Sequence, residues 1–295
     1  NEKIVKIDAR EKKYSVVDFA PWKNGIVSII NYEDSSFKDL YNILFLAYDN
    51  NKIESINIKI ENNLKKNRIK TKRDEVFLAT NNGLQIYDTE FNLKETILEK
   101  ENILDFDWNK NGELYILTYN ALKLVKKSKT IDDILITNEY NKLNVCKSGQ
   151  IWLSNEKSAL SIIGEKQQTI NSKNGLPNDK INCILEDIEG NIWFGLYGSG
   201  LSQLVPANFE TFDESQGLKS DQISSIYMDH LSRLWIAGEH TIDILEFYSN
   251  SNFSLKNIIH LNELIDLSAE TTNFIYQDSR LLMWLGTDNG VYILD

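Results

Sequence analysis

The chain has 295 residues, of which 42% are hydrophobic and 25% charged, and its formal net charge is −11. This composition excludes intrinsic disorder, because enough apolar surface is available to offset the entropy of folding. The acidic balance argues against nucleic acid and against an anionic membrane surface as partners, since both repel it. Apolar runs fall far short of the roughly 20 residues that span a bilayer, so any membrane attachment is expected to use a segment outside this sequence.

Short strands and a recurring aromatic position dominate the chain. Alternating or apolar strands are predicted first at residues 3–8 and 14–20, and extra residues follow at 32–40. Along the whole chain, large apolar or aromatic residues recur at spacings of 37 to 50 residues, about 43 on average. These marks are Val27, Phe77, Tyr115, Trp152, Trp193, Trp235 and Trp284. Repeats of this length made of strands are typical of β-propeller blades.

The clearest repeat, which begins at Gly175, shows four strands, at residues 181–187, 191–197, 200–205 and 209–212. We therefore predict an all-β fold, a single seven-bladed β-propeller of four-stranded blades over residues 1–295. Residues 260–270 (HLNELIDLSAE) are expected to form a short helical insertion. The last repeat reaches only its third strand, at 290–295, so the strand at 3–8 is expected to supply the fourth and to close the ring.

The repeated residues are interpreted as structural. The tryptophans are expected to pack between blades, and Asp187, Asp229 and Asp278 to bond amides of their own turns. Gly195, Gly238 and Gly286 are expected to leave room where strands crowd. Trp22, in a turn, is the one tryptophan that could serve as an exposed anchor.

The sequence offers little for catalysis or metal binding. Cys146 and Cys183 are too few for a disulfide framework and are expected to be buried thiols, with a single bridge as the alternative. Since His230, His240 and His260 lack ligand spacing and no nucleotide or nucleophile motif is present, we predict no cofactor, no metal and no enzymatic activity. Glu239 with His240 remains open as an acid–base pair.

The stretch GLPNDKINCILEDIEGNIWFGLYGSGLSQL, from Gly175 to Leu204, resembles the two-component regulator propeller repeat. The resemblance is good over 217–245 and 272–294 and only architectural before residue 149. It implies the periplasmic sensor region of a Bacteroidetes hybrid two-component system, which detects glycan fragments and signals through a membrane helix to a cytoplasmic histidine kinase. Such receptors carry two propellers, a β-sandwich and the membrane helix, so one propeller implies a fragment or a shorter relative. A homodimer formed through the parent receptor is also implied.

The same resemblance places the Gly-Leu-Pro loops and the loops after the tryptophan strands on one ligand-binding face. Their side chains provide hydroxyl, amide, carboxylate and aromatic groups, a mixture suited to an oligosaccharide or another small ligand. The candidate ligand-binding residues are Asn82, Tyr119, Asn155, Asn178, Tyr197, Ser220, Glu239 and Asp288.

Two other functions stay open. An enzyme similar to the streptogramin lyases would need a histidine and a carboxylate at a metal-assisted site, for which His240 with Glu239 is the candidate. A protein-interaction propeller would use the insertion at 260–270 and Trp22 as contacts.

Overall fold

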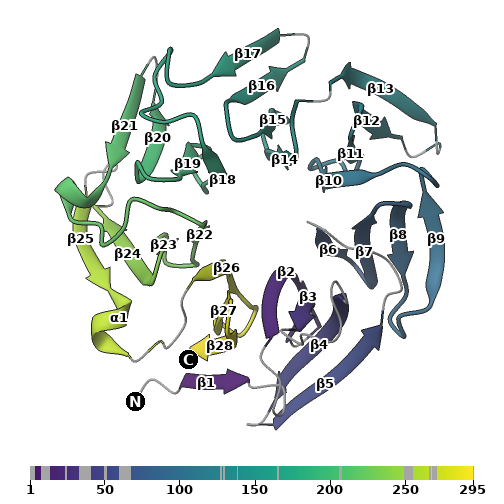
Figure 1. The fold of residues 1–295 in the computed structure, drawn as a ribbon, viewed down its shortest axis with the longest axis horizontal. Helices are drawn as coiled ribbons and strands as arrows, with labels where there is room; N and C mark the ends of the chain where they lie inside the picture. The colour runs from purple at the N-terminus through teal and green to yellow at the C-terminus, as the bar shows by residue number, and fades with distance from the viewer. Residues whose placement is uncertain are drawn as a thin grey trace. The chain divides into compact units, whose positions relative to one another are not determined.

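The chain folds into four-stranded β-sheets in this computed structural model (Figure 1). The structure describes residues 4–7, 14–23, 25–32, 41–49, 52–59, 68–126, 128, 130–137, 139–164, 166–205, 208–248, 255–265, 267 and 271–294. The described strands form seven such sheets. The all-β class and the four-stranded blades of a β-propeller are therefore confirmed.

Two compact units divide the chain. The N-terminal unit comprises Ile4–Leu143 with Asn289–Tyr292, and the C-terminal unit comprises Asn144–Asp288 with the end residues. Among the described residues, no helix is both long enough and apolar enough to cross a membrane.

Three sheets of consecutive strands lie in the N-terminal unit, each with strand order equal to chain order. The first contains β2 (Tyr14–Trp22), β3 (Gly25–Tyr32), β4 (Tyr41–Asp49) and β5 (Lys52–Lys59). The second contains β6 (Ile69–Lys72), β7 (Glu75–Thr80), β8 (Gly83–Tyr87) and β9 (Leu93–Ile97), and the third β10 (Ile103–Trp108), β11 (Leu114–Thr118), β12 (Ala121–Val125) and β13 (Ile131–Ile136). The extra residues predicted at 32–40 lie outside the described residues after Tyr32.

Three further sheets of consecutive strands follow. They contain β14 (Lys142–Val145), β15 (Ile151–Ser154), β16 (Ala159–Ile163) and β17 (Lys166–Ile170); β18 (Ile181–Glu186), β19 (Ile192–Leu196), β20 (Leu201–Val205) and β21 (Asn208–Phe212); and β22 (Ser225–Met228), β23 (Leu234–Gly238), β24 (Thr241–Phe247) and β25 (Leu255–His260). A 3₁₀ turn, η1 (Glu214–Gln216), follows β21. The predicted insertion begins with a single helical turn, α1 (Leu261–Leu264).

The last sheet joins the two ends of the chain. Its order is β1 (Ile4–Ile7), β28 (Gly290–Leu294), β27 (Met283–Thr287) and β26 (Thr272–Gln277). The N-terminal strand therefore completes the sheet formed by the C-terminal strands, as the sequence predicts. This pairing covers the edge that β28 would otherwise present to solvent.

The second strand of each sheet carries the repeated aromatic position and lies in the core. Every residue of β15, β19, β23 and β27 is buried, whereas the fourth strands β9, β13 and β17 are mostly exposed. Trp193 packs with Leu234 and Ile236 of the following sheet, and Trp152 lies edge-on to Phe194 at 5.3 Å. The predicted packing between sheets is confirmed for Trp152 and Trp193, and Trp235 and Trp284 are buried.

Each turn aspartate organises the hairpin that carries its tryptophan. One carboxylate oxygen of Asp187 accepts the N–H groups of Glu189 and Asn191, and the other accepts Nε1–H of Trp193 at 2.9 Å. Asp229 and Asp278 bond Trp235 and Trp284 in the same way. These carboxylates therefore serve the fold, as predicted.

Trp22 corrects an expectation. The alternative of an exposed anchor is wrong, because Trp22 ends β2 with only 3% of its surface exposed. Its ring lies 6.1 Å from that of Phe91, which lies in the turn between β8 and β9 of the next sheet. A hydrophobic partner 69 positions along the chain was not apparent from the turn-like sequence around Trp22.

Candidate functional site

All eight predicted ligand-binding residues lie in two classes of loop: those between second and third strands, and those from a fourth strand to the next first strand. Backbone bonds join these two classes at the same end of the sheets. Gly83 donates to Glu101 O at 2.8 Å in the N-terminal unit, and Tyr197 donates to Lys180 O at 3.0 Å in the C-terminal unit. Within each unit the predicted residues therefore share one end of the strands.

Four of them are brought together in the C-terminal unit. We call the row Asn178, Lys180, Tyr197, Gln222, Glu239, Thr271 and Asp288 the C-terminal rim. Consecutive members are linked: Asn178 Nδ2 donates to Tyr197 O at 2.9 Å, Tyr197 forms a bridge with Gln222, and Gln222 Nε2 donates to Glu239 Oε2 at 2.5 Å. A bridge from Glu239 to Thr271 and a bond from Asp288 N–H to Thr271 O complete the row.

Of the other four, Asn155 and Ser220 belong to the C-terminal unit, and Asn82 and Tyr119 to the N-terminal unit. Asn155 Oδ1 accepts the N–H groups of Lys157 and Ser158 and closes its own turn. Ser220 is 8% exposed, and its Oγ accepts the Gln222 N–H beneath the rim. Asn82 and Tyr119 belong to the N-terminal unit, where Asn82 Oδ1 accepts the Lys100 N–H and Tyr119 is 58% exposed.

Lys180 and Gln222 are rim residues that sequence reasoning missed. Lys180 immediately precedes β18, and Gln222 lies three residues before β22. Each contacts a predicted residue: the Lys180 ammonium lies 3.9 Å from the centroid of the Tyr197 ring, and Gln222 Nε2 donates to Glu239 Oε2. Their position one residue before the apolar residues Ile181 and Ile223 could have indicated this placement.

The one open acid–base pair has a loose geometry. His240 Nε2 lies 4.0 Å from Glu239 Oε1, and both side chains are at least half exposed. Within the described ranges, no three His, Cys, Asp or Glu side chains gather in a way that could hold a metal ion. Cys146 and Cys183 are both thiols; Cys146 is buried as expected, whereas Cys183 is only partly buried.

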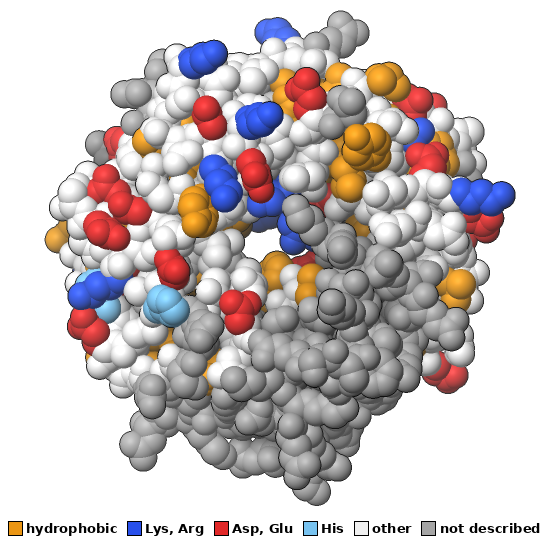
Figure 2. All heavy atoms as spheres, in the orientation of Figure 1, with side chains coloured by type: hydrophobic (Ala, Val, Ile, Leu, Met, Phe, Trp, Pro, Cys, Tyr) orange, Lys and Arg blue, Asp and Glu red, His pale blue; other side chains and the backbone are white. Residues whose placement is uncertain are grey.

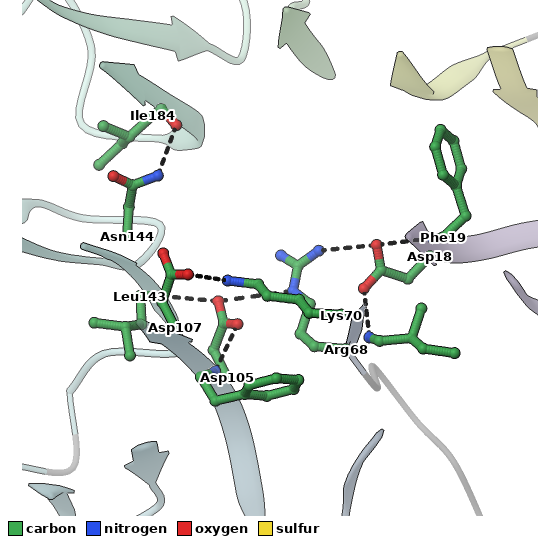
Figure 3. Close-up of polar contacts among 11 residues, drawn as sticks. Asp18, Phe19, Arg68, Lys70, Asp105, Asp107, Leu143, Asn144 and Ile184 are labelled. Carbon is green, nitrogen blue, oxygen red and sulfur yellow. Dashed lines mark hydrogen bonds and ion pairs between the residues drawn. The ribbon is translucent and has the colours of Figure 1, made fainter. Parts of the chain in front are cut away.

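The N-terminal unit holds an ionic cluster around two buried aspartates, Asp18 of β2 and Asp105 of β10 (Figure 3). Asp18 accepts the N–H groups of Phe19 and Ile69, and Asp105 accepts those of Phe106 and Leu143. Arg68 lies between the two carboxylates, 3.9 Å from Asp18 Oδ1 and 3.7 Å from Asp105 Oδ2. Each aspartate thus fastens the first strand of its own sheet to the beginning of the next.

Burial raises the pKa of the Asp18 carboxyl to about 6, against the opposing effects of the Arg68 charge and the Ile69 N–H. Beside this cluster, Lys70 Nζ pairs with Asp107 Oδ1 at 3.2 Å. The carboxylates of the cluster bind backbone N–H groups and cations of the same unit. We therefore interpret the cluster as structural, holding the first strands of neighbouring sheets in position.

One face of the molecule carries charges of both signs. In Figure 2, acidic and basic side chains are interspersed over the described part of this face, and hydrophobic side chains stand singly or in small groups.

Residues 175–198 match the sequence family described as "Two component regulator propeller". Residues 175–198 carry one two-component regulator propeller repeat. The matched segment begins three residues before Asn178 and ends one residue after Tyr197, so it contains one end of the C-terminal rim.

Solved structures with the same fold include signalling and lyase proteins. The extracellular domain of a putative hybrid two-component system from B. thetaiotaomicron is 18% identical, with a TM-score of 0.68 over 99% of this chain and 41% of that chain. The extracellular domain of a putative one-component system from the same organism is also 18% identical, with a TM-score of 0.69 over 98% and 39%. This chain therefore spans about two fifths of either.

A catalytically inactive variant of virginiamycin B lyase from Staphylococcus aureus, solved with quinupristin, is 13% identical, with a TM-score of 0.71 over 100% of this chain and 99% of that chain. No match was found among curated protein sequences. At these identities the likenesses establish the β-propeller fold.

Proposed function

We propose that this protein is the extracytoplasmic sensor domain of a hybrid two-component receptor, which binds an oligosaccharide at the C-terminal rim and signals to a cytoplasmic histidine kinase. The observation that carries the proposal is the regulator repeat at 175–198, which coincides with part of the rim. The extracellular domains of the two B. thetaiotaomicron systems support the same assignment.

The chemistry of the rim agrees with a sugar ligand. Tyr197 is 45% exposed and offers an aromatic surface, while Gln222, Glu239 and Asp288 offer amide and carboxylate groups along the same row. Sugars present apolar ring faces and many hydroxyls, so an aromatic side chain beside convergent polar groups is a suitable binding surface.

The proposal extends to the parent protein. In the parent protein, the seven sheets form one seven-bladed propeller that lies in the periplasm. A membrane segment outside this sequence connects the propeller to the kinase. The receptor works as a homodimer, and the propeller itself binds without a cofactor and without catalysing a reaction.

Calorimetric titration with a panel of oligosaccharides tests ligand binding. Heat of binding is expected for at least one member. Tyr197→Ala is expected to weaken that binding about tenfold, because the aromatic ring that packs against the sugar is lost. Tyr248→Ala is the matched control, since Tyr248 is 53% exposed and lies outside the rim. Absence of heat across the whole panel would contradict the proposal.

Lyase activity is the second candidate function. It is favoured by the similarity to virginiamycin B lyase, which covers nearly the full length of both chains. Incubation with quinupristin, with and without Mg²⁺, followed by mass spectrometry tests it. Conversion of the substrate that His240→Ala abolishes would support a lyase, and intact substrate would reject it.

A further inference from the structure

The aromatic surface of the C-terminal rim carries a positive charge. Lys180 Nζ lies 3.9 Å from the centroid of the half-exposed Tyr197 ring. Cation–π contacts of this kind are favourable and leave the ammonium charged and partly solvated. The ring and the charge therefore form a single two-part surface.

Asn178 fixes this surface in place. Its Oδ1 accepts the Lys180 N–H at 2.9 Å and its Nδ2 donates to Tyr197 O at 2.9 Å, while the Tyr197 N–H donates to Lys180 O. Both residues are held by their backbones through the same asparagine. A surface organised before binding loses less conformational entropy when a ligand arrives.

The charge of Lys180 is not neutralised by the described side chains, among which none forms an ion pair with it. Nearby acids are engaged elsewhere: Asp179 Oδ1 accepts the Ser172 N–H, and Asp221 Oδ1 accepts the Glu214 N–H. Glu239 Oε2 accepts from Gln222. In a chain with a net charge of −11, an ammonium that forms no ion pair with a described carboxylate is suited to an anion brought by a ligand.

We propose that Lys180 and Tyr197 form a subsite for a carboxylate-bearing sugar unit, with the sugar ring against Tyr197 and the carboxylate on the Lys180 ammonium. This inference rests on the proposed function, which it narrows from oligosaccharides in general to acidic ones.

The test is calorimetry with matched acidic and neutral ligands. Trigalacturonate and a hyaluronan tetrasaccharide are compared with galactotriose and cellotetraose. At least one acidic member is expected to bind ten times more tightly than its neutral counterpart at low salt, and the difference is expected to shrink as salt screens the charge.

Two substitutions test whether the charge of Lys180 itself, and not a change in folding, accounts for binding of the acidic ligand. Lys180→Gln is expected to lower affinity for the acidic ligand about tenfold and to lower affinity for a neutral ligand by a much smaller factor. Lys166→Gln, which removes the same charge from the exposed outer strand β17, is expected to change neither. Unchanged circular dichroism and melting temperature confirm that Lys180→Gln is folded.

The outcomes distinguish the two proposals. Binding of neutral members alone, or equal loss of neutral and acidic binding in Lys180→Gln, would overturn the acidic subsite while the sensor proposal stands. If no member of the panel binds, both are overturned.

Discussion

At the scale of single residues, one repeat departs from the aspartate–tryptophan pattern. Asp187, Asp229 and Asp278 each accept the indole N–H six residues later, but Cys146 occupies the equivalent position before Trp152. Trp152 Nε1 is buried and has no hydrogen-bond partner among the described residues. A buried donor without an acceptor destabilises the folded state.

Cys146→Asp is therefore expected to raise the free energy of unfolding by about 1 kcal/mol, as the new carboxylate accepts Trp152 Nε1–H together with the Ser148 and Gln150 N–H groups. Urea unfolding followed by tryptophan fluorescence measures the change. Cys146→Ala, which adds no acceptor, is the control. A lower midpoint for Cys146→Asp would show that burial of the charge outweighs the restored bond.

Asp18 makes stability depend on pH. Its pKa is 3.8 when unperturbed and about 6 in the folded chain, so the folded state binds the proton more tightly. The stability that this proton contributes is fully present below pH 4 and is lost as pH rises through 6, a difference of about 3 kcal/mol. Asp18→Asn is expected to remove this slope from urea unfolding measured between pH 4 and 7.

Asp74→Asn, at an exposed position in the turn between β6 and β7, is expected to keep the slope. Equal slopes in the parent chain and in Asp18→Asn would contradict the assignment. The overall stability of Asp18→Asn is expected to fall, because an amide oxygen cannot replace both acceptors for Phe19 and Ile69.

At the scale of elements, much of the repeat could be predicted from the sequence. The strands predicted in the clearest repeat match β18 to β21 within one residue at each end, because apolar alternation and turn residues are local signals. Trp22 and Lys180 were misjudged or missed, since their surroundings come from other strands. Whether the rim residues bind a ligand stays a prediction.

Sheet-to-sheet spacing depends on small residues such as Gly195 of β19. A methyl group there would lie 2.4 Å from Cys183 Sγ and 2.8 Å from Ile223 Cγ2. Gly195→Ala is expected to lower the free energy of unfolding by about 1–3 kcal/mol through overpacking. Thermal unfolding measures the loss, which is expected to be smaller when Cys183→Ala is also present; an unchanged melting temperature in Gly195→Ala would refute this spacing role.

At the scale of the whole molecule, the pairing of β1 with β28 shields an edge strand. Removal of residues 1–8 is expected to expose the β28 edge, to lower the melting temperature and to promote association through strand pairing. Light scattering and size-exclusion chromatography detect the association, and a peptide of residues 1–13 added in trans is expected to reverse it. A shortened chain that stays monomeric with an unchanged melting temperature would contradict this role.

The same pairing sets an order of events during biosynthesis. Because β1 pairs with β28, its sheet cannot be completed until β28 has been synthesised, while the six sheets of consecutive strands can form as they emerge. Contacts of such large sequence separation form slowly. Completion of this sheet is therefore expected to follow the six others, and until β28 has been synthesised β1 lacks its partner strand.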